Sequence, residues 1–155
     1  MSEKITSLKE YVTAACTEIL PMFGLEHKFM CELPEKSLNS CEEINILIGL
    51  THGITGSMVV GLTKDSALKI VSGMMGGAEV PELDMMAKSA LSEFMNILGG
   101  STVGKIAAEI NELVDISTPT IVTGKKMFLM ISRAPSKKLF FKLGETKFNI
   151  AYCIE

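Results

Sequence analysis

The sequence predicts a single α+β domain over residues 1–155, because helical and strand-like segments are grouped along the chain instead of alternating. Residues 3–20 place apolar side chains at three- and four-residue steps, which indicates an amphipathic helix. Residues 43–62 contain two apolar, strand-like runs around a turn, which indicates a hairpin. Residues 115–155 are again strand-like. Few parallel crossovers are implied, which also favours the α+β class.

The first helix should end at Pro21, because proline removes a helical hydrogen bond and clashes with the preceding turn. In the hairpin that follows, the runs INILIGL and ITGSMVVGL are separated by Thr51, His52 and Gly53. The glycine supplies the permissive backbone that a tight turn needs. Runs as apolar as these are typical of strands at the centre of a sheet.

Two further helices are expected before the C-terminal strands. Asp65 is a good N-cap for the first, and Gly76 and Gly77 supply the left-handed backbone that ends it. The second follows Pro81 and runs from about residue 84 to 113. Three glycines weaken its middle by up to about 1 kcal/mol each relative to alanine. They either allow close packing within the fold or leave a flat strip for a partner. These are Gly99, Gly100 and Gly104.

The C-terminal region should form strands punctuated by Pro119 and Gly124 and should end in a hairpin. In that hairpin the runs LFFKL and KFNIAYCI flank residues 144–146. Its flanking lysines either protect a sheet edge from pairing or mark an edge that is used for pairing.

Composition excludes several classes of function. Charged residues make up 21% of the 155 residues and the net charge is −3, so no strong field exists to recruit nucleic acid or an anionic membrane. No apolar run approaches the roughly 20 residues of a spanning helix, and the polar N-terminus is unlike a secretory signal, so we expect a cytoplasmic protein. The four cysteines form no CxxC pair and are expected to be reduced and mostly buried, with no thiolate metal site.

The long predicted helix has one apolar and one polar side when it is projected at about 100° per residue. On the polar side, Ser89, Glu93 and Asn96 fall within an arc of about 60° because they are separated by four and three residues. Lys88 and Ser92 lie on the same side. An exposed polar surface without function would look the same. The residues assigned to the core side are Ala87, Ala90, Leu91, Phe94, Met95 and Leu98.

The spacing Ser89-x3-Glu93-x2-Asn96 resembles the signature of the CheC, CheX and FliY chemotaxis phosphatases, in which Asp or Ser precedes Glu by four residues and Asn follows after three more. Residues 49–77 resemble the hairpin and short helix of that family. Residues 114–126 resemble the segment after its long catalytic helix.

The signature occurs once in this chain, as in the CheX branch of the family. A second copy would begin at Glu18, but Pro21 stands where its asparagine would be, and proline has no side-chain amide. Glu42 and Asn45 repeat the Glu-x2-Asn spacing, but on a strand a three-residue step reverses the face.

The resemblance implies a CheC-like fold, with a largely antiparallel sheet packed against a long catalytic helix and shorter helices. It also implies an enzyme that hydrolyses the phosphoryl-aspartate of a CheY-like response regulator. Asn96 would hold a water in line with phosphorus, since positioning is the main protein contribution to phosphoryl transfer. Glu93 would accept a charge-assisted bond from the partner's active-site lysine. The expected partner contacts are Ser89, Ser92, Gly99 and Gly100.

The same resemblance implies that this chain binds no metal or cofactor of its own and that magnesium lies in the partner's active site. Relatives resembling CheX are homodimers joined through their sheets, so a homodimer is expected. Two alternatives stay open. One is a non-catalytic interaction module like the flagellar-switch relatives, and the other is a small-ligand sensor, for which no convergent polar pocket is evident.

The histidines and the methionine pairs are given no function. His27 and His52 have no metal or triad spacing. The methionine pairs at 74–75 and 85–86 either fill the core or form an adaptable partner surface.

Overall fold

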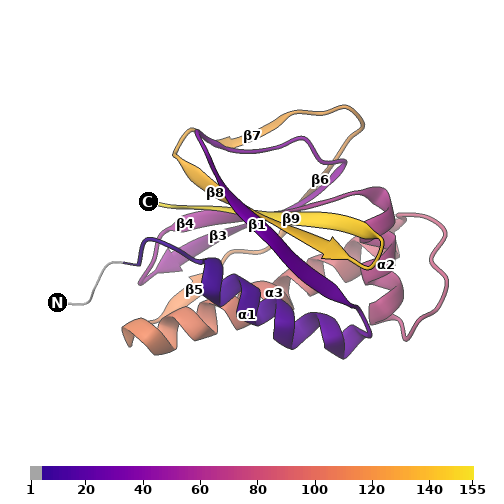
Figure 1. The fold of residues 1–155 in the computed structure, drawn as a ribbon, viewed down its shortest axis with the longest axis horizontal. Coiled ribbons are helices and arrows are strands. Elements are labelled where there is room, and N and C mark those ends of the chain that lie inside the picture. The colour runs from indigo at the N-terminus through magenta and orange to yellow at the C-terminus, as the bar shows by residue number, and fades with distance from the viewer. Residues whose placement is uncertain (1–4) are drawn as a thin grey trace.

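The computed structural model describes residues 5–155, which form a large sheet with helices on one face and a small second sheet on the other (Figure 1). The helices are α1 (Lys9–Ile19), a 3-10 helix (Leu20–Phe23), α2 (Lys64–Met74) and α3 (Met85–Ile110). The strands are β1 (His27–Glu35), β2 (Leu38–Ser40), β3 (Ile44–His52), β4 (Gly56–Leu62), β5 (Val114–Ile116), β6 (Thr120–Thr123), β7 (Leu129–Ser132), β8 (Ser136–Leu143) and β9 (Thr146–Ile154). This confirms the predicted α+β class.

The large sheet has seven strands in the order β1-β8-β9-β4-β3-β5, and β6 also pairs with β3. Every pairing in it is antiparallel, as predicted. The hairpin of β3 and β4 lies at the centre, because β4 is bonded to β9 on its other side and β3 to β5 and β6. A two-stranded sheet of β2 and β7 lies apart from it.

The connection of the central hairpin contains the predicted turn residues. Leu50–Gly56 is the last pair between β3 and β4, so residues 51–55 connect the two strands, although β3 itself continues through Thr51 and His52. His52 itself takes the left-handed backbone, with φ of 73°. Thr51 and His52 pair with Asp115 and Val114 of β5, which extends strand β3 into the expected turn.

The apolar core lies between the large sheet and the helices. It contains the residues predicted for the core side of α3, and of these only Ala90 is partly exposed. A smaller cluster on the opposite face packs β2 and β7 against the sheet, around Leu38, Val59 and Cys153. The polar side of α3 therefore faces away from the core.

Several local predictions were wrong. The N-cap of α2 is Thr63, whose Oγ1 accepts from the backbone N–H of Ser66 at 3.0 Å, so Asp65 lies in the first turn instead. The last hairpin is not an edge, because β8 is bonded to β1 and β9 to β4. The first helix begins at Lys9, later than the pattern from residue 3 indicated, and residues 3 and 4 lie outside the described part of the chain.

Two features of the helices agree with the sequence. A 3-10 turn that contains Pro21 follows α1, so the α-helix does stop before the proline. Gly76 and Gly77 both have positive φ after α2, as expected for a left-handed helix stop. Within residues 5–155 no helix is both long enough and apolar enough to cross a membrane.

Candidate functional site

The candidate site lies on α3, and a capping residue at each end defines where this helix begins and ends. Asp84 is the N-cap, and its Oδ1 accepts from the backbone N–H of Ala87 at 2.8 Å. Asn111 ends the helix in the left-handed conformation, with φ of 56°. The 26 residues between these caps form one continuous helix in spite of three internal glycines. Residues eleven apart, such as Ser89 and Gly100, therefore share a rigid frame.

One flank of α3 is held against α1. Lys105 on α3 lies 2.7 Å from a carboxylate oxygen of Glu18 on α1, and Ser101 donates to the other oxygen at 3.3 Å. The Lys105 ammonium holds the pKa of Glu18 below its usual value. Glu18, which the sequence places in a degenerate second signature, therefore links two helices.

The opposite flank of α3 packs against the sheet through Gly99. A Cβ added there would lie 2.8 Å from Cδ1 of Ile48 on β3 and 3.3 Å from Cδ1 of Ile116 on β5. Gly99 is itself buried. The expectation that Gly99 contacts a partner is therefore corrected: this glycine allows close approach of the helix to its own sheet.

Between these flanks runs an exposed strip that includes Ser89, Glu93, Asn96 and Gly100. Ser92 lies at its margin and is half-buried. Within the described chain, the side chains of Glu93 and Asn96 make no hydrogen bond or ion pair with any other residue. One carboxylate and one carboxamide, one helical turn apart, thus point to solvent with all their hydrogen-bonding groups available.

Glycines and methionines extend this strip in both directions. Nothing lies within 4 Å of a Cβ added at Gly100 or Gly104, so the C-terminal part has no side-chain relief. At the N-terminal end Met85 is 85% and Met86 is 59% exposed. For these two methionines core filling is wrong, and a flexible apolar surface lies beside the polar pair.

The other residues considered from the sequence lie elsewhere. His27 is on the edge strand β1 near the ring of Phe141, and burial lowers its pKa. His52 lies at the end of β3. Among residues 5–155, no three His, Cys, Asp or Glu side chains gather as a metal ion would need. Two of the four cysteines, Cys31 and Cys41, are exposed, so the expectation that most are buried is wrong.

Residues 44–141 match the family model described as "Chemotaxis phosphatase CheX", which covers more than half of the chain and includes the whole strip. The chain belongs to the CheX family. A curated relative, "CheY-P phosphatase CheX" of Thermotoga maritima, is 43% identical over an alignment of 96 residues, and the match covers 57% of this chain and 59% of the relative. The matched part is thus less than two thirds of the length of that CheX protein.

Solved structures of CheX proteins share the fold. A chemotaxis protein CheX from Desulfovibrio desulfuricans superposes with a TM-score of 0.81 at 22% identity, covering 95% of this chain and 97% of that one. The CheX–CheY–BeF3–Mg complex from Borrelia burgdorferi matches with a TM-score of 0.67 at 16% identity, covering 96% of this chain and 95% of that one. The CheC-like fold that the resemblance implied is therefore confirmed.

Proposed function

We propose that this chain hydrolyses the phosphoryl-aspartate of a CheY-like response regulator, and that Asn96 positions the attacking water. The observation that carries the proposal is the exposed pair of Glu93 and Asn96, whose polar groups have no partner within the described chain. The name of the Thermotoga relative, a CheY-P phosphatase, supports this choice of substrate.

In the proposed reaction this chain forms no covalent bond with the phosphoryl group. A water oxygen attacks phosphorus, the bond between phosphorus and the aspartyl carboxylate oxygen breaks, and the products are phosphate and a free aspartate. The Asn96 carboxamide has an oxygen that accepts from the water and an N–H group that donates to a phosphoryl oxygen. Such positioning accounts for most of the protein's contribution to phosphoryl transfer. Magnesium, held in the regulator, would neutralise the phosphoryl charge.

Glu93 has a different role in this proposal. Its carboxylate lies one turn before Asn96 on the same face, so it accepts a charge-assisted hydrogen bond from a lysine of the regulator while the amide reaches the phosphoryl group. This contact sets the register of the two proteins. Ser89, Ser92 and Gly100 border the pair and are proposed as further partner contacts, whereas Gly99 faces inward.

Assembly and location are also proposals. The edge strand β1 pairs only with β8 among the described residues, so its outer side offers backbone groups through which a second copy of the sheet can add. We infer a homodimer joined in this way. The proposed substrate is a response regulator of a two-component pathway, which places the reaction in the cytoplasm.

The test is the decay of a phosphorylated, purified CheY-like regulator in the presence of magnesium. Wild-type protein should accelerate this decay, and Asn96→Ala should lower the acceleration by about 10²-fold, because a misplaced reactant costs about that much. Glu109→Ala, which alters an exposed residue further along the same helix, is the matched control and should leave the rate unchanged.

Two outcomes would contradict the proposal. If Asn96→Ala, with an unchanged circular dichroism spectrum, were as active as wild type, the water would be held elsewhere. If wild-type protein bound the phosphorylated regulator without changing its decay, the chain would be a non-catalytic interaction module for that regulator.

A further inference from the structure

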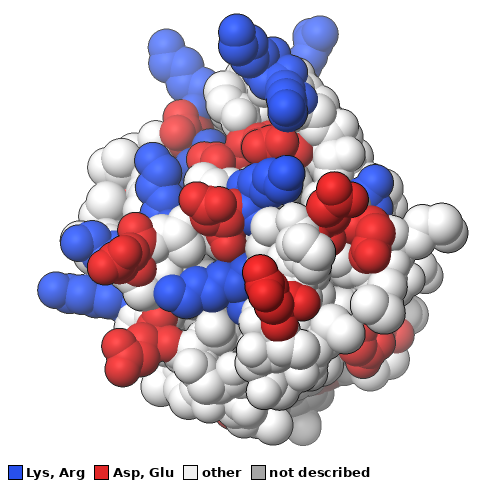
Figure 2. All heavy atoms as spheres, turned by 90° about the vertical axis from the view of Figure 1, so that its right-hand side faces the viewer, with Lys and Arg blue, Asp and Glu red and all other residues white. Residues whose placement is uncertain are grey.

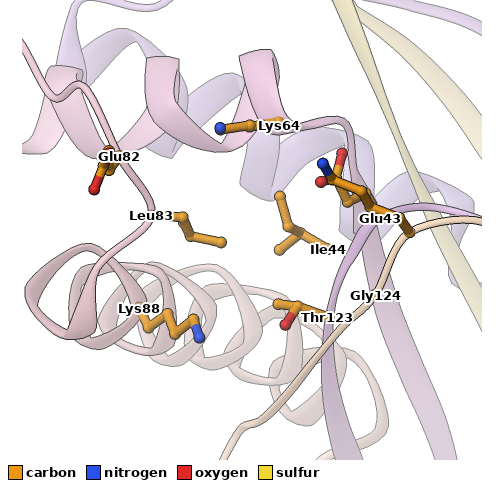
Figure 3. Close-up of a pocket in the computed structure, with 9 residues that line it drawn as sticks. Glu43, Ile44, Lys64, Glu82, Leu83, Lys88, Thr123 and Gly124 are labelled. Carbon is orange, nitrogen blue, oxygen red and sulfur yellow. The ribbon is translucent and has the colours of Figure 1, made fainter.

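An open hollow of about 400 Å³ lies beside the first turns of α2 and α3 (Figure 3). Three lysines from three separate elements line it. Lys64 is the first residue of α2, Lys88 lies in the first turn of α3, and Lys125 follows β6. The sequence places them up to 61 positions apart, and only Lys88 belongs to the helix that carries the signature. We call this hollow the lysine pocket.

The lysine side chains enter the lysine pocket from different sides, and apolar side chains lie between them. In Figure 3 the side chains of Lys64 and Lys88 extend from opposite helices, and Leu83 and Ile44 lie between them. All three lysines are exposed. Within the described residues none of them has a carboxylate within ion-pair distance. Their charge is therefore not used within the fold.

Two acidic residues, Glu43 and Glu82, also line the pocket, which leaves it with a net charge of about one positive unit. Glu82 lies at the margin, on the loop that precedes α3 (Figure 3). Figure 2 shows basic and acidic side chains interspersed over this end of the molecule. The positive charge therefore belongs to the pocket itself, and the face as a whole is not positively charged.

The lysine pocket borders the strip that carries the candidate site. Lys88 immediately precedes Ser89 and lies about 80° around the helix from Asn96. The rise between Lys88 and Asn96 is about 12 Å along the axis. A specific protein interface covers about 800 Å² on each partner. A globular partner centred on Glu93 and Asn96 would therefore cover the lysine pocket as well.

We propose that the lysine pocket docks acidic side chains of the response regulator, from the rim of its phosphoryl site. This inference rests on the proposed function. A protein that holds Mg²⁺ beside an aspartyl phosphate does so with carboxylates, since magnesium prefers oxygen ligands, so acidic side chains gather at such a site in addition to the lysine that Glu93 would contact. The three ammonium groups, which are unpaired within the described residues, are opposite in charge to such carboxylates, and their pocket borders the strip.

The docking has a kinetic consequence that separates it from the chemistry. Charges at the rim of an interface act mainly on association and on its dependence on salt. The lysine pocket therefore lowers the KM for the phosphorylated regulator, whereas Asn96 sets kcat. Raising the ionic strength should weaken the contribution of the pocket without changing the turnover of bound regulator.

The test compares two triple variants with equal changes in net charge. Lys64→Gln, Lys88→Gln and Lys125→Gln together neutralise the pocket. Lys69→Gln, Lys142→Gln and Lys147→Gln, on α2, β8 and β9 and away from strand β1, form the control. All six lysines are exposed, so both variants should fold.

The pocket variant should raise KM about tenfold, keep kcat within about twofold and flatten the dependence of kcat/KM on sodium chloride. The control should match wild type in all three. A pocket variant with wild-type KM and salt dependence would overturn the inference. An equal rise of KM in both variants would also overturn it, because only net charge would then matter.

Two further arms keep this inference separate from the proposed hydrolysis. Calorimetry with a regulator loaded with beryllofluoride and magnesium measures docking without turnover. Weaker binding by the pocket variant alone supports docking even if wild-type protein proves inactive as a phosphatase, and equal binding overturns it. In the second arm inorganic phosphate is titrated into the chain without regulator. Lysine-dependent saturation would assign the pocket to a free anion and overturn docking.

Discussion

Lys105 on α3 and Glu18 on α1 form an ion pair with a distance of 2.7 Å, and this pair links the helix of the candidate site to its neighbour. The residue that most resembles a second catalytic glutamate is thus turned toward a lysine and a serine of the same chain. Because Glu18 is exposed and Lys105 is partly exposed, solvent screens the pair and its contribution to stability is small.

Glu18→Gln should lower the stability slightly at pH 7, and the difference should vanish in acid. The pKa of Glu18 is lowered in the folded chain by Lys105, so its contribution is present above the unfolded pKa and is lost as the pH falls through the folded value. Urea unfolding of both proteins at pH 7 and pH 3 measures this. If the difference in the free energy of unfolding between wild type and Glu18→Gln persisted at pH 3, the charge of Glu18 would not be its cause.

Gly100→Ala and Gly104→Ala should each stabilise α3 by about 0.5–1 kcal/mol, because alanine restricts the unfolded chain and meets nothing within 4 Å in the fold. Gly99→Ala should stabilise the protein less or should destabilise it, since the added Cβ displaces Cδ1 of Ile48. Thermal unfolding compares the three variants. Equal stabilities for Gly99→Ala and Gly100→Ala would show that the packing of Gly99 has been misjudged.

Larger substitutions at Gly100 and Gly104 test whether this part of the strip contacts the regulator. Gly100 lies one turn after Asn96, so Gly100→Leu should reduce kcat/KM for a phosphorylated regulator, while Gly104→Leu, a further turn away, should reduce it less. If both leucine variants retained wild-type kcat/KM, the flat part of the strip would lie outside the interface.

Native protein should present two fast thiols to a thiol reagent such as DTNB at pH 8, namely Cys31 and Cys41, which are exposed. Burial raises the pKa of Cys16 to about 12 and also raises that of Cys153, so both stay protonated and shielded. All four should react in denaturant. A third fast thiol in the native protein would mean that the core around α1 or β9 opens readily.

Lys28, Lys142 and Lys147 lie directly opposite one another on β1, β8 and β9, so three cations stand in a row across the sheet. Like charges in such pairs are destabilising, and Lys142→Glu turns two repulsions into attractions. The variant should gain about 0.5–1 kcal/mol at low salt. Chemical denaturation with and without 0.5 M sodium chloride measures the gain, and one that does not shrink with salt would argue against this explanation.

The central hairpin and the core face of α3 could be predicted from sequence because their apolar patterns are strong and continuous. The edge strand β1 could not: most of HKFMCELPE is exposed or half-buried, and it contains Pro34, which an edge strand tolerates. The N-cap of α2 was misassigned because Thr63 and Asp65 are both good capping residues, and only the backbone shows which one is used.

The candidate strip was predicted with one wrong member, and the error has a geometric cause. Gly99 and Gly100 are the same residue at consecutive positions, but they are turned about 100° from one another on the helix. Only the neighbours Ile48 and Ile116 show that the first one faces the sheet. Lys64 and Lys125 had no signal in the sequence, because nothing in their local pattern indicates that the fold brings them to α3.

The pairing of β9 with β4 also has a consequence for biosynthesis. The proposed chemistry is confined to one helix, but the sheet on which that helix packs closes only when β8 and β9 are in place, and both follow α3 in the sequence. During translation α1, α2 and the β3–β4 hairpin, on which α3 packs, are synthesised before it, but β4 still lacks its neighbour β9. The helix of the strip can therefore dock on a hairpin whose sheet is completed only by the last strands of the chain.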